Sequence, residues 1–538
     1  MSRWRRLLEL PFHPFLFTIY AVFFLWSQNV GKVRMADVVV PLAYVMAGTA
    51  VVFLLGWLAF RNPWRSAIVA SVWSFLFFSF GHITGSVRSA AETTKGPSNE
   101  GLWLVIWALL SVTAVVLVAV VRPSGRRLAF VLNLVLGVLV GVAVLAIGTQ
   151  KVQARREAAR VAEANVEPSS TAAASGAAPA STRTDRDIYY FVVEEYPNLQ
   201  ILRERYDFDN SDFLTSLQER GFYIPTEMRA PYPKTPHSVS ATLNMEYLDS
   251  FPKESSNWQR VYDSLKGSRV STYLQKRGYK YVLIGSGYHA IDRDPAADVN
   301  LEYDPKAGPV QSEFGEVLYD STVMAAVASR YHVGALDVRN RRYQQVLYMY
   351  QQLANIPKDP ATTFTFAHME TTHSPYVIDR DGHFMSEQRA NKMTSHEAYL
   401  ESLRYANKRA LELIDRIQHA YPADRQPIIV YQADEGPGPV GWNPNSREHY
   451  DWTRAPQDQL DLKFGIFSSY YLPGLKGTGL YPSISTVNSF RVILDKYFGE
   501  KMALLPDRSY VFKNELAPYD FIDVTDRIKK RSVRTDSR

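Results

Sequence analysis

The stretch "IIVYQADEGPG", residues 428–438, decides how the second half of this chain folds. It opens with a run of β-branched and aromatic residues that is typical of a buried strand. The run ends in two adjacent carboxylates, Asp434 and Glu435, followed by a Gly-Pro-Gly sequence that breaks the strand. Carboxylates held this close repel each other and retain protons unless a cation lies between them. This strand end is therefore a candidate site.

Similar runs alternate with helical patterns from residue 187 onward. The strand candidates are "DIYYFVVEE" (187–195), "YKYVLIGSG" (279–287), "ATTFTFAHME" (361–370), "QPIIVYQAD" (426–434) and "LKFGIFSSYYLPG" (462–474). Helices are expected at 211–220 and at about 267–276, 341–354, 387–420 and 486–498. This alternation predicts an α/β domain whose mostly parallel sheet is sandwiched by helices. Ligands of such sheets bind at the carboxyl ends of the strands.

Three of the expected strands end in groups that bind metals. One ends in Glu194 and Glu195, a second in His368 with His373 soon after, and the third in Asp434 and Glu435. In a parallel sheet these ends share one edge. A site built from oxygen ligands suits Mn, Mg or Ca better than Zn. The alternative interpretation is that each acid is a solvated loop residue or a helix N-cap.

The segment "YPKTPHSVSATLNMEYL", residues 232–248, predicts an extended loop followed by a helix from about Ser238. Thr235 precedes that helix, where free N–H groups and the helix dipole stabilise an alkoxide or a phosphoryl group. With a metal on its oxygen, Thr235 is a candidate nucleophile. Lys234 and His237 lie beside it and are candidates for holding an anionic group. The alternative is that Thr235 or Ser238 is only an N-cap.

The first 150 residues are strongly apolar and contain five stretches that approach the length needed to span a bilayer. They run roughly over Phe15–Val30, Val38–Phe60, Ser66–Thr84, Gly101–Val121 and Leu128–Gly148. The first is the shortest, and a signal peptide is the alternative for it. We therefore expect a bundle of about five transmembrane helices.

The distribution of basic residues in the short loops predicts the orientation. One set of loops is richer in arginine than the other. This places the N-terminus in the cytoplasm and the large C-terminal domain outside the cytoplasmic membrane. The arginines of the richer set are Arg3, Arg5, Arg6, Arg61, Arg65, Arg122, Arg126 and Arg127. The expected organisation is a transmembrane domain (1–150), a helical stem with an Ala/Ser/Pro-rich flexible linker (151–185) and an outer domain (186–538). The net charge of +6 is weak evidence for nucleic acid, and none is expected as a partner.

Several segments of the outer part are together similar to one protein family. They include "DIYYFVVEEY", "YPKTPHSVSATLNMEYL", "FTFAHMETTHSPYVIDRDG" and "QADEGPG", in that order, between about Asp187 and Tyr510. The chain resembles the membrane-anchored, sulfatase-like hydrolase/transferase branch of the alkaline phosphatase superfamily. Lipoteichoic acid synthases and phosphoethanolamine transferases belong to that superfamily. The resemblance implies an alkaline-phosphatase-like fold for the outer domain.

The resemblance also implies roles for individual residues. Glu194 and Asp434 match metal ligands, and Thr235 matches the nucleophile, which also contacts the metal. His368 and His373 match a pair of histidines near the substrate, the second acting in catalysis. Glu195 falls where sulfatases carry a second acid.

One position departs from the family pattern: Glu435 stands where the family has histidine. A glutamate still binds a hard cation, so Glu435 is predicted as a fourth metal ligand, and the departure favours Mn, Mg or Ca over Zn. Glu435 equally motivates the alternative of an inactive domain that binds an envelope glycan or a partner protein.

The chain has no cysteine, and threonine cannot form the formylglycine of classical sulfatases. This disfavours sulfate-ester hydrolysis and favours phosphoryl transfer through Thr235. We therefore expect a membrane-bound, metal-dependent transferase. It would move a phosphoglycerol or phosphoethanolamine type of head group from a lipid donor to an envelope glycan or lipid, through a phospho-threonine intermediate. A phosphodiesterase using the same site is a further alternative. A transporter is disfavoured because the spans lack paired charges.

Overall fold

The computed structural model describes residues 7–94, 100–164 except 122 and 124, 185–303, 312–356 except 332, 334 and 335, 360–439, 450–475 and 479–529. Two compact units divide the chain. The first contains residues 1–169 and 305–341, and the second contains residues 170–304 and 342–538. The predicted flexible linker falls mostly on residues 165–184, which lie outside the described residues.

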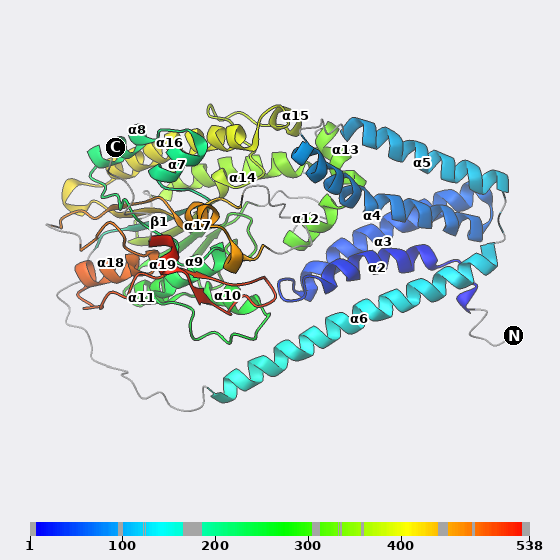
Figure 1. Ribbon diagram of the computed structural model, residues 1–538, viewed down its shortest axis with the longest axis horizontal. Coiled ribbons are helices and arrows are strands. Elements are labelled where there is room, and N and C mark those ends of the chain that lie inside the picture. Colours follow the sequence, from blue (N-terminus) through cyan, green and yellow to red (C-terminus); the bar gives the residue numbers. More distant parts are fainter. Residues whose placement is uncertain are drawn as a thin grey trace. The chain divides into compact units, whose positions relative to one another are not determined.

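The first unit is a set of long apolar helices, drawn in blue and cyan in Figure 1. They are α2 (His13–Ser27), α3 (Met35–Phe60), α4 (Pro63–Thr94), α5 (Glu100–Val121) and α6 (Gly125–Ala164). Four of them, α3 to α6, are long and apolar enough to cross a membrane, whereas α2 has only 15 residues. Of the five predicted spans, four are thus confirmed in length and composition, and the first, predicted as the shortest, is an apolar helix of only 15 residues. Helix α6 also covers the predicted stem.

A segment expected in the outer domain belongs instead to this first unit. Helices α12 (Glu313–Asp320) and α13 (Val323–Tyr331) pack against α3, α4 and α5. The contact is close because Gly81 has no side chain: a Cβ there would lie 2.5 Å from the carbonyl oxygen of Asp320. The Gly81 N–H donates to the Ser321 carbonyl at 3.0 Å. Hydrophobic periodicity does not predict this packing, because α12 and α13 are short and amphipathic like surface helices of the outer domain.

The second unit is built on a six-stranded sheet of order β3-β2-β4-β1-β5-β6. Its strands are β1 (Ile188–Val193), β2 (Lys280–Ile284), β3 (Val299–Leu301), β4 (Thr363–Met369), β5 (Ile428–Ala433) and β6 (Ser468–Tyr471). All neighbours are parallel except β6, which is antiparallel to β5. The predicted α/β class with a mostly parallel sheet is confirmed. The very short β3 was not predicted.

Helices cover both faces of the sheet (Figure 1), with α14 and α16 on one face and α9, α11 and α18 on the other. The remaining bounds are α7 (Leu199–Tyr206), α8 (Ser211–Glu219), α9 (Thr235–Asn244), α10 (Gln259–Ser264), α11 (Arg269–Gln275), α14 (Val338–Leu353), α15 (Glu387–Ala390), α16 (Ser395–Ala420), α17 (Gln457–Phe464), α18 (Ser489–Phe498) and α19 (Thr525–Lys529). A small antiparallel pair, β7 (Tyr510–Val511) with β8 (Ile522–Asp523), completes the unit. The central strands β1 and β5 are buried along their whole length, so their ends are fixed by the core.

Candidate metal and phosphoryl-transfer site

The strand register brings three acidic or imidazole side chains to one edge of the sheet. Val193 pairs with Met369 on one side and with Ala433 on the other. The next residues along β1 and β5 are Glu194 and Asp434, so these two acids follow paired positions. His368 is the penultimate residue of β4 and pairs with Val192. The ligand atoms of Glu194, His368 and Asp434 all lie within 4.8 Å of one another.

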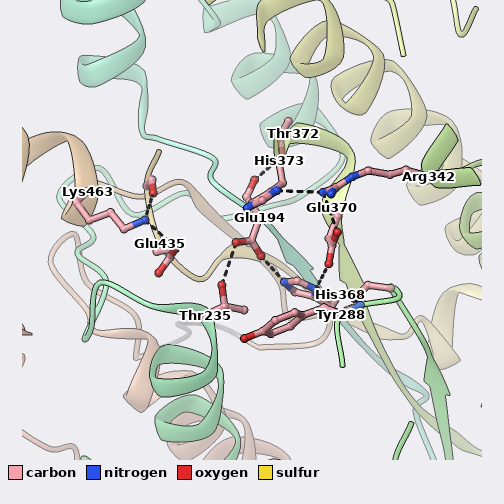
Figure 2. Close-up of polar contacts among 12 residues, drawn as sticks. Glu194, Thr235, Tyr288, Arg342, His368, Glu370, Thr372, His373, Glu435 and Lys463 are labelled. Carbon is pink, nitrogen blue, oxygen red and sulfur yellow. Dashed lines mark hydrogen bonds and ion pairs between the residues drawn. The ribbon is translucent and has the colours of Figure 1, made fainter. Parts of the chain in front are cut away.

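Thr235 reaches this cluster from the N-terminus of α9 (Figure 2). Its Oγ1 donates to Glu194 Oε1 at 2.9 Å, and the residue is 7% exposed. The alternative that Thr235 or Ser238 is an N-cap is wrong. The N-cap is Lys234, which makes no side-chain capping bond, and the Ser238 hydroxyl donates to the Tyr232 carbonyl. The Thr235 hydroxyl thus faces the acids from the positive end of a helix.

The acids of this cluster are buried without enough cations to balance them. Burial, with the neighbouring acids, raises the pKa of Glu194 to about 8, although His373 partly offsets the shift. Burial, followed by the charges of Glu194 and Glu435, raises the pKa of Asp434 well above its usual range. Neither oxygen of the Asp434 carboxylate accepts a hydrogen bond from the described residues. Two buried carboxylates that repel each other, one of which accepts no hydrogen bond, are what a divalent cation stabilises.

The oxygen and nitrogen atoms of this cluster are of the kinds that bind a divalent metal. Glu194 and Asp434 offer carboxylate oxygens, His368 offers an imidazole nitrogen, and Thr235 offers a hydroxyl. His368 Nε2 lies 2.5 Å from Glu194 Oε2, and its Nδ1 lies 3.1 Å from Ser286 Oγ. A proton held on Nδ1 toward Ser286 leaves Nε2 free to bind an ion. His368, predicted as a substrate-binding residue, therefore lies among the metal-binding atoms.

Glu435, predicted as the fourth ligand, has a different partner in the structure. Its Oε1 accepts a hydrogen bond from Lys463 Nζ at 2.7 Å. Burial raises the pKa of Glu435, while Lys463 and Lys234 lower it in part. Metal binding by Glu435 stays a prediction. The sequence analysis did not predict a role for Lys463, because the sequence around it shows only a single basic residue near an apolar run.

A second cluster next to the acids centres on His373. Arg342, at the start of α14, donates from Nη2 to His373 Nδ1 at 3.1 Å and pairs with Glu370 Oε2 at 2.8 Å. Arginine has no acceptor atom, so Nδ1 carries a lone pair and the His373 proton resides on Nε2. Burial would raise the pKa of Glu370, but Arg342 and the histidines outweigh it and the pKa is lowered. Nothing in the sequence around Arg342 points to this role.

The remaining predicted site residues differ in their contacts, and not all of them belong to the candidate site. Glu195 is half-buried and has a positive φ of 51°, and its carbonyl accepts from the Tyr399 hydroxyl. Lys234 Nζ lies 3.3 Å from Glu515 Oε1. The His237 ring is buried between aromatic rings, 5.1 Å from Trp258 and 5.2 Å from Phe512 between ring centroids. The structure therefore places His237 in the core rather than in the site.

Comparisons with known proteins give distant structural likenesses only. No protein-family model matches the chain, and no curated protein matches its sequence. The C-terminal periplasmic domain of EcEptC from Escherichia coli, in complex with Zn, is 12% identical with a TM-score of 0.40, and the match covers 63% of this chain and 92% of that one. The integral membrane lipooligosaccharide phosphoethanolamine transferase A from Neisseria meningitidis is 12% identical with a TM-score of 0.35, covering 90% and 93%. The lipoteichoic acid synthase LtaP from Listeria monocytogenes is 13% identical with a TM-score of 0.38, covering 62% and 78%.

At these identities and TM-scores, the role of each residue has to follow from its own contacts.

Proposed function

We propose that the chain is a membrane-bound, metal-dependent transferase that moves a phosphoryl-linked head group from a lipid donor to a hydroxyl of an envelope glycan or lipid. The observation that carries this proposal is the Thr235 hydroxyl, which lies 2.9 Å from Glu194 at a helix N-terminus, beside the buried Asp434, whose oxygens accept no hydrogen bond of good geometry from the described residues. Glu194, His368 and Asp434 would hold a divalent ion, which would supply positive charge near the Thr235 oxygen and the phosphoryl group. The acids favour Mn, Mg or Ca, and the histidine also permits Zn.

In the first step, Thr235 Oγ1 forms a bond to the phosphorus of the donor and the bond from phosphorus to the lipid oxygen breaks. The Thr235 proton leaves along its hydrogen bond to Glu194 Oε1. His373, whose Nε2 carries a proton because Arg342 occupies Nδ1, is placed to protonate the departing lipid oxygen. In the second step, an acceptor hydroxyl attacks the phosphorus and gives its proton to His373 Nε2, which lost its own in the first step. The bond from phosphorus to Thr235 Oγ1 breaks, and the proton held at Glu194 Oε1 returns to Oγ1 and restores the hydroxyl.

The membrane helices suit a donor that stays in the bilayer. We propose that the N-terminus is cytoplasmic and that the second unit lies outside the cytoplasmic membrane, because the arginine-rich loops favour the cytoplasmic side. The chain has no cysteine. A single cysteine introduced at exposed Lys501 should therefore react with a membrane-impermeant maleimide on intact cells. Labelling only after lysis would reverse the orientation.

Intact-mass analysis tests the nucleophile and the donor together. The full chain in detergent with Mn²⁺ is incubated with vesicles of phosphatidylglycerol or phosphatidylethanolamine. We expect one head-group adduct on the wild type, none on Thr235→Ala, and an unchanged adduct on the matched control Ser238→Ala, which lies on the same helix. No adduct and no lipid turnover with any donor would favour the inactive alternative. Turnover to a free head group without an acceptor would favour the phosphodiesterase.

A further inference from the structure

A buried ion pair lies directly beside the candidate metal cluster. Lys463 Nζ donates to Glu435 Oε1 at 2.7 Å and to the Gly436 carbonyl at 2.8 Å. The side chains of Lys463 and Glu435 are 4% and 6% exposed. A buried ammonium 2.7 Å from a buried carboxylate has the geometry of an ion pair, so Lys463 places a positive charge inside the site.

The backbone holds this pair in place. The Gly436 N–H donates to the Lys463 carbonyl at 2.7 Å, and a Cβ on Gly436 would lie 2.0 Å from the carbonyl oxygen of Leu462. Only glycine lets the end of β5 approach the end of α17 this closely. The glycine after the two acids thus brings a lysine 28 positions later against the second of them.

The two adjacent acids differ in what neutralises them. Glu435 is paired with Lys463 through Oε1, although its Oε2 accepts no hydrogen bond from the described residues, whereas Asp434 and Glu194 have no basic side chain within ion-pair distance among the described residues, apart from the imidazole of His368. Two unbalanced carboxylates carry a charge of −2, which one divalent cation neutralises. With Glu435 already balanced, a second divalent cation would lie against the Lys463 ammonium and be repelled.

We propose that Lys463 is a built-in cation that takes the place of a second metal ion. It holds Glu435 out of the ligand set, so that the site binds a single divalent ion through Glu194, His368 and Asp434. This inference rests on the proposed metal site, but it concerns the number of ions and the role of Glu435 rather than the reaction.

Metal binding by the full chain in detergent tests this proposal without any assay of activity. After a chelator has removed bound metal, Mn²⁺ is titrated by calorimetry and the bound metal is counted by elemental analysis. We expect one Mn²⁺ per wild-type chain. Glu435→Gln strands the Lys463 ammonium beside the ion and should weaken Mn²⁺ binding by about tenfold or more. The double variant Glu435→Gln with Lys463→Met removes both charges and should restore affinity to within about threefold of the wild type.

Two further variants complete the design. Lys463→Met frees Glu435 and should raise the number of bound Mn²⁺ ions from one to two, whereas the exposed control Lys496→Met should change nothing. Removing one partner of a buried pair is often destabilising. If Lys463→Met does not fold, the double variant decides the matter.

The proposal is overturned if the double variant binds as weakly as Glu435→Gln, since Glu435 would then be a ligand. It is also overturned if a folded Lys463→Met binds one ion with unchanged affinity. Failure of the proposed transfer reaction would appear separately, as a chain that binds one ion and forms no adduct on Thr235.

Discussion

Among the described residues of the second unit, two groups of side chains have the composition of a metal site, and they differ in their electrostatics. One consists of Glu194, His368 and Asp434, and the other of Asp379, Asp381 and His383. Each offers two carboxylates and one imidazole within 4.8 Å. The first group is fully buried, whereas only one residue of the second is buried. Composition alone therefore does not separate a metal centre from a surface turn.

Hydrogen bonding separates the two groups. Asp379 accepts the N–H groups of Asp381 at 3.0 Å and His383 at 2.8 Å, and it pairs with Arg389 at 2.7 Å. Burial would raise its pKa, but these contacts outweigh burial and the pKa is lowered. In the first group the pKa values of Glu194 and Asp434 are raised, and neither Asp434 oxygen accepts a hydrogen bond of good geometry from the described residues. A carboxylate that already accepts hydrogen bonds and an ion pair stabilises a turn, whereas one without such contacts is available to bind an ion.

The largest expected effect is on metal affinity. Asp434→Asn removes a charge that only the ion balances, and it should lower Mn²⁺ affinity by at least about 100-fold, since even residues that support metal ligands are worth about 10–100-fold. Asp379→Asn should leave the affinity within about twofold of the wild type. Calorimetric titration of the full chain measures both. The assignment of metal binding to the first group alone is contradicted if both variants lose the metal, or if neither does.

The pH dependence of binding is the next largest effect. The pKa of Glu194 is about 8 in the metal-free fold, against an ordinary value of 4.5, so the folded chain keeps a proton that the unfolded chain releases between these values. The metal-free protein should therefore lose stability as pH rises from about 4.5 to 8. Because Mn²⁺ displaces this proton, its affinity should rise by up to about tenfold per pH unit below 8.

Asp379 contributes nothing to this slope, because its pKa is lowered and the group stays ionised throughout the window. Calorimetry in two buffers of different ionisation enthalpy counts the protons released on binding. Proton release near pH 6.5 supports the assignment. A metal-free Tm that rises between pH 5 and 8 contradicts it, provided that Asp379→Asn shows the same trend as the wild type.

Much of this arrangement could be predicted from the sequence, because it depends on local patterns. The runs that became β1, β4 and β5 each show a strand ending in a polar group, and a parallel sheet gathers such ends at one edge. Thr235 was predicted just ahead of a helix beginning at about Ser238, and the helix in fact begins at Thr235 itself. These features need only short stretches of chain and one rule about parallel sheets.

The parts that could not be predicted depend on contacts between distant segments. Lys463 lies 28 residues from Glu435 and Arg342 lies 31 residues from His373, and a single sequence does not reveal which basic residue meets which partner. The same holds for α12 and α13, whose packing on the first unit depends on the missing side chain of Gly81. His237 was misjudged because its nearness to Thr235 in sequence hid a side chain that points into the core.

A smaller effect is expected on thermal stability, where the variant of the Asp379 group should be the one that loses and the variant of the Asp434 group the one that gains. Asp379→Asn weakens the acceptor of two backbone N–H groups and an arginine, which should cost about 1–3 kcal/mol and lower Tm by a few degrees. Asp434→Asn removes a carboxyl that burial and the neighbouring acids keep from ionising in the fold, and it should raise the Tm of the metal-free protein at neutral pH. Thermal melts of the chelator-treated full chain, followed by near-ultraviolet circular dichroism, compare the two. Equal shifts of the same sign would show that Asp434 has a partner after all.

The smallest effect is expected at the histidine of the second group. His383 is 75% exposed, and its ring lies 3.4 Å from an Asp379 carboxylate that Arg389 and the backbone already satisfy. Exposed pairs of this kind contribute about 0–1 kcal/mol, so His383→Ala should shift Tm by at most about 2 °C and leave Mn²⁺ affinity unchanged. The matching change His368→Ala removes a buried imidazole from the first group and should weaken Mn²⁺ binding by about 10–100-fold. If His383→Ala weakened Mn²⁺ binding as much as His368→Ala does, a satisfied turn would bind metal as well as an unsatisfied cluster, and hydrogen bonding would not distinguish the two groups.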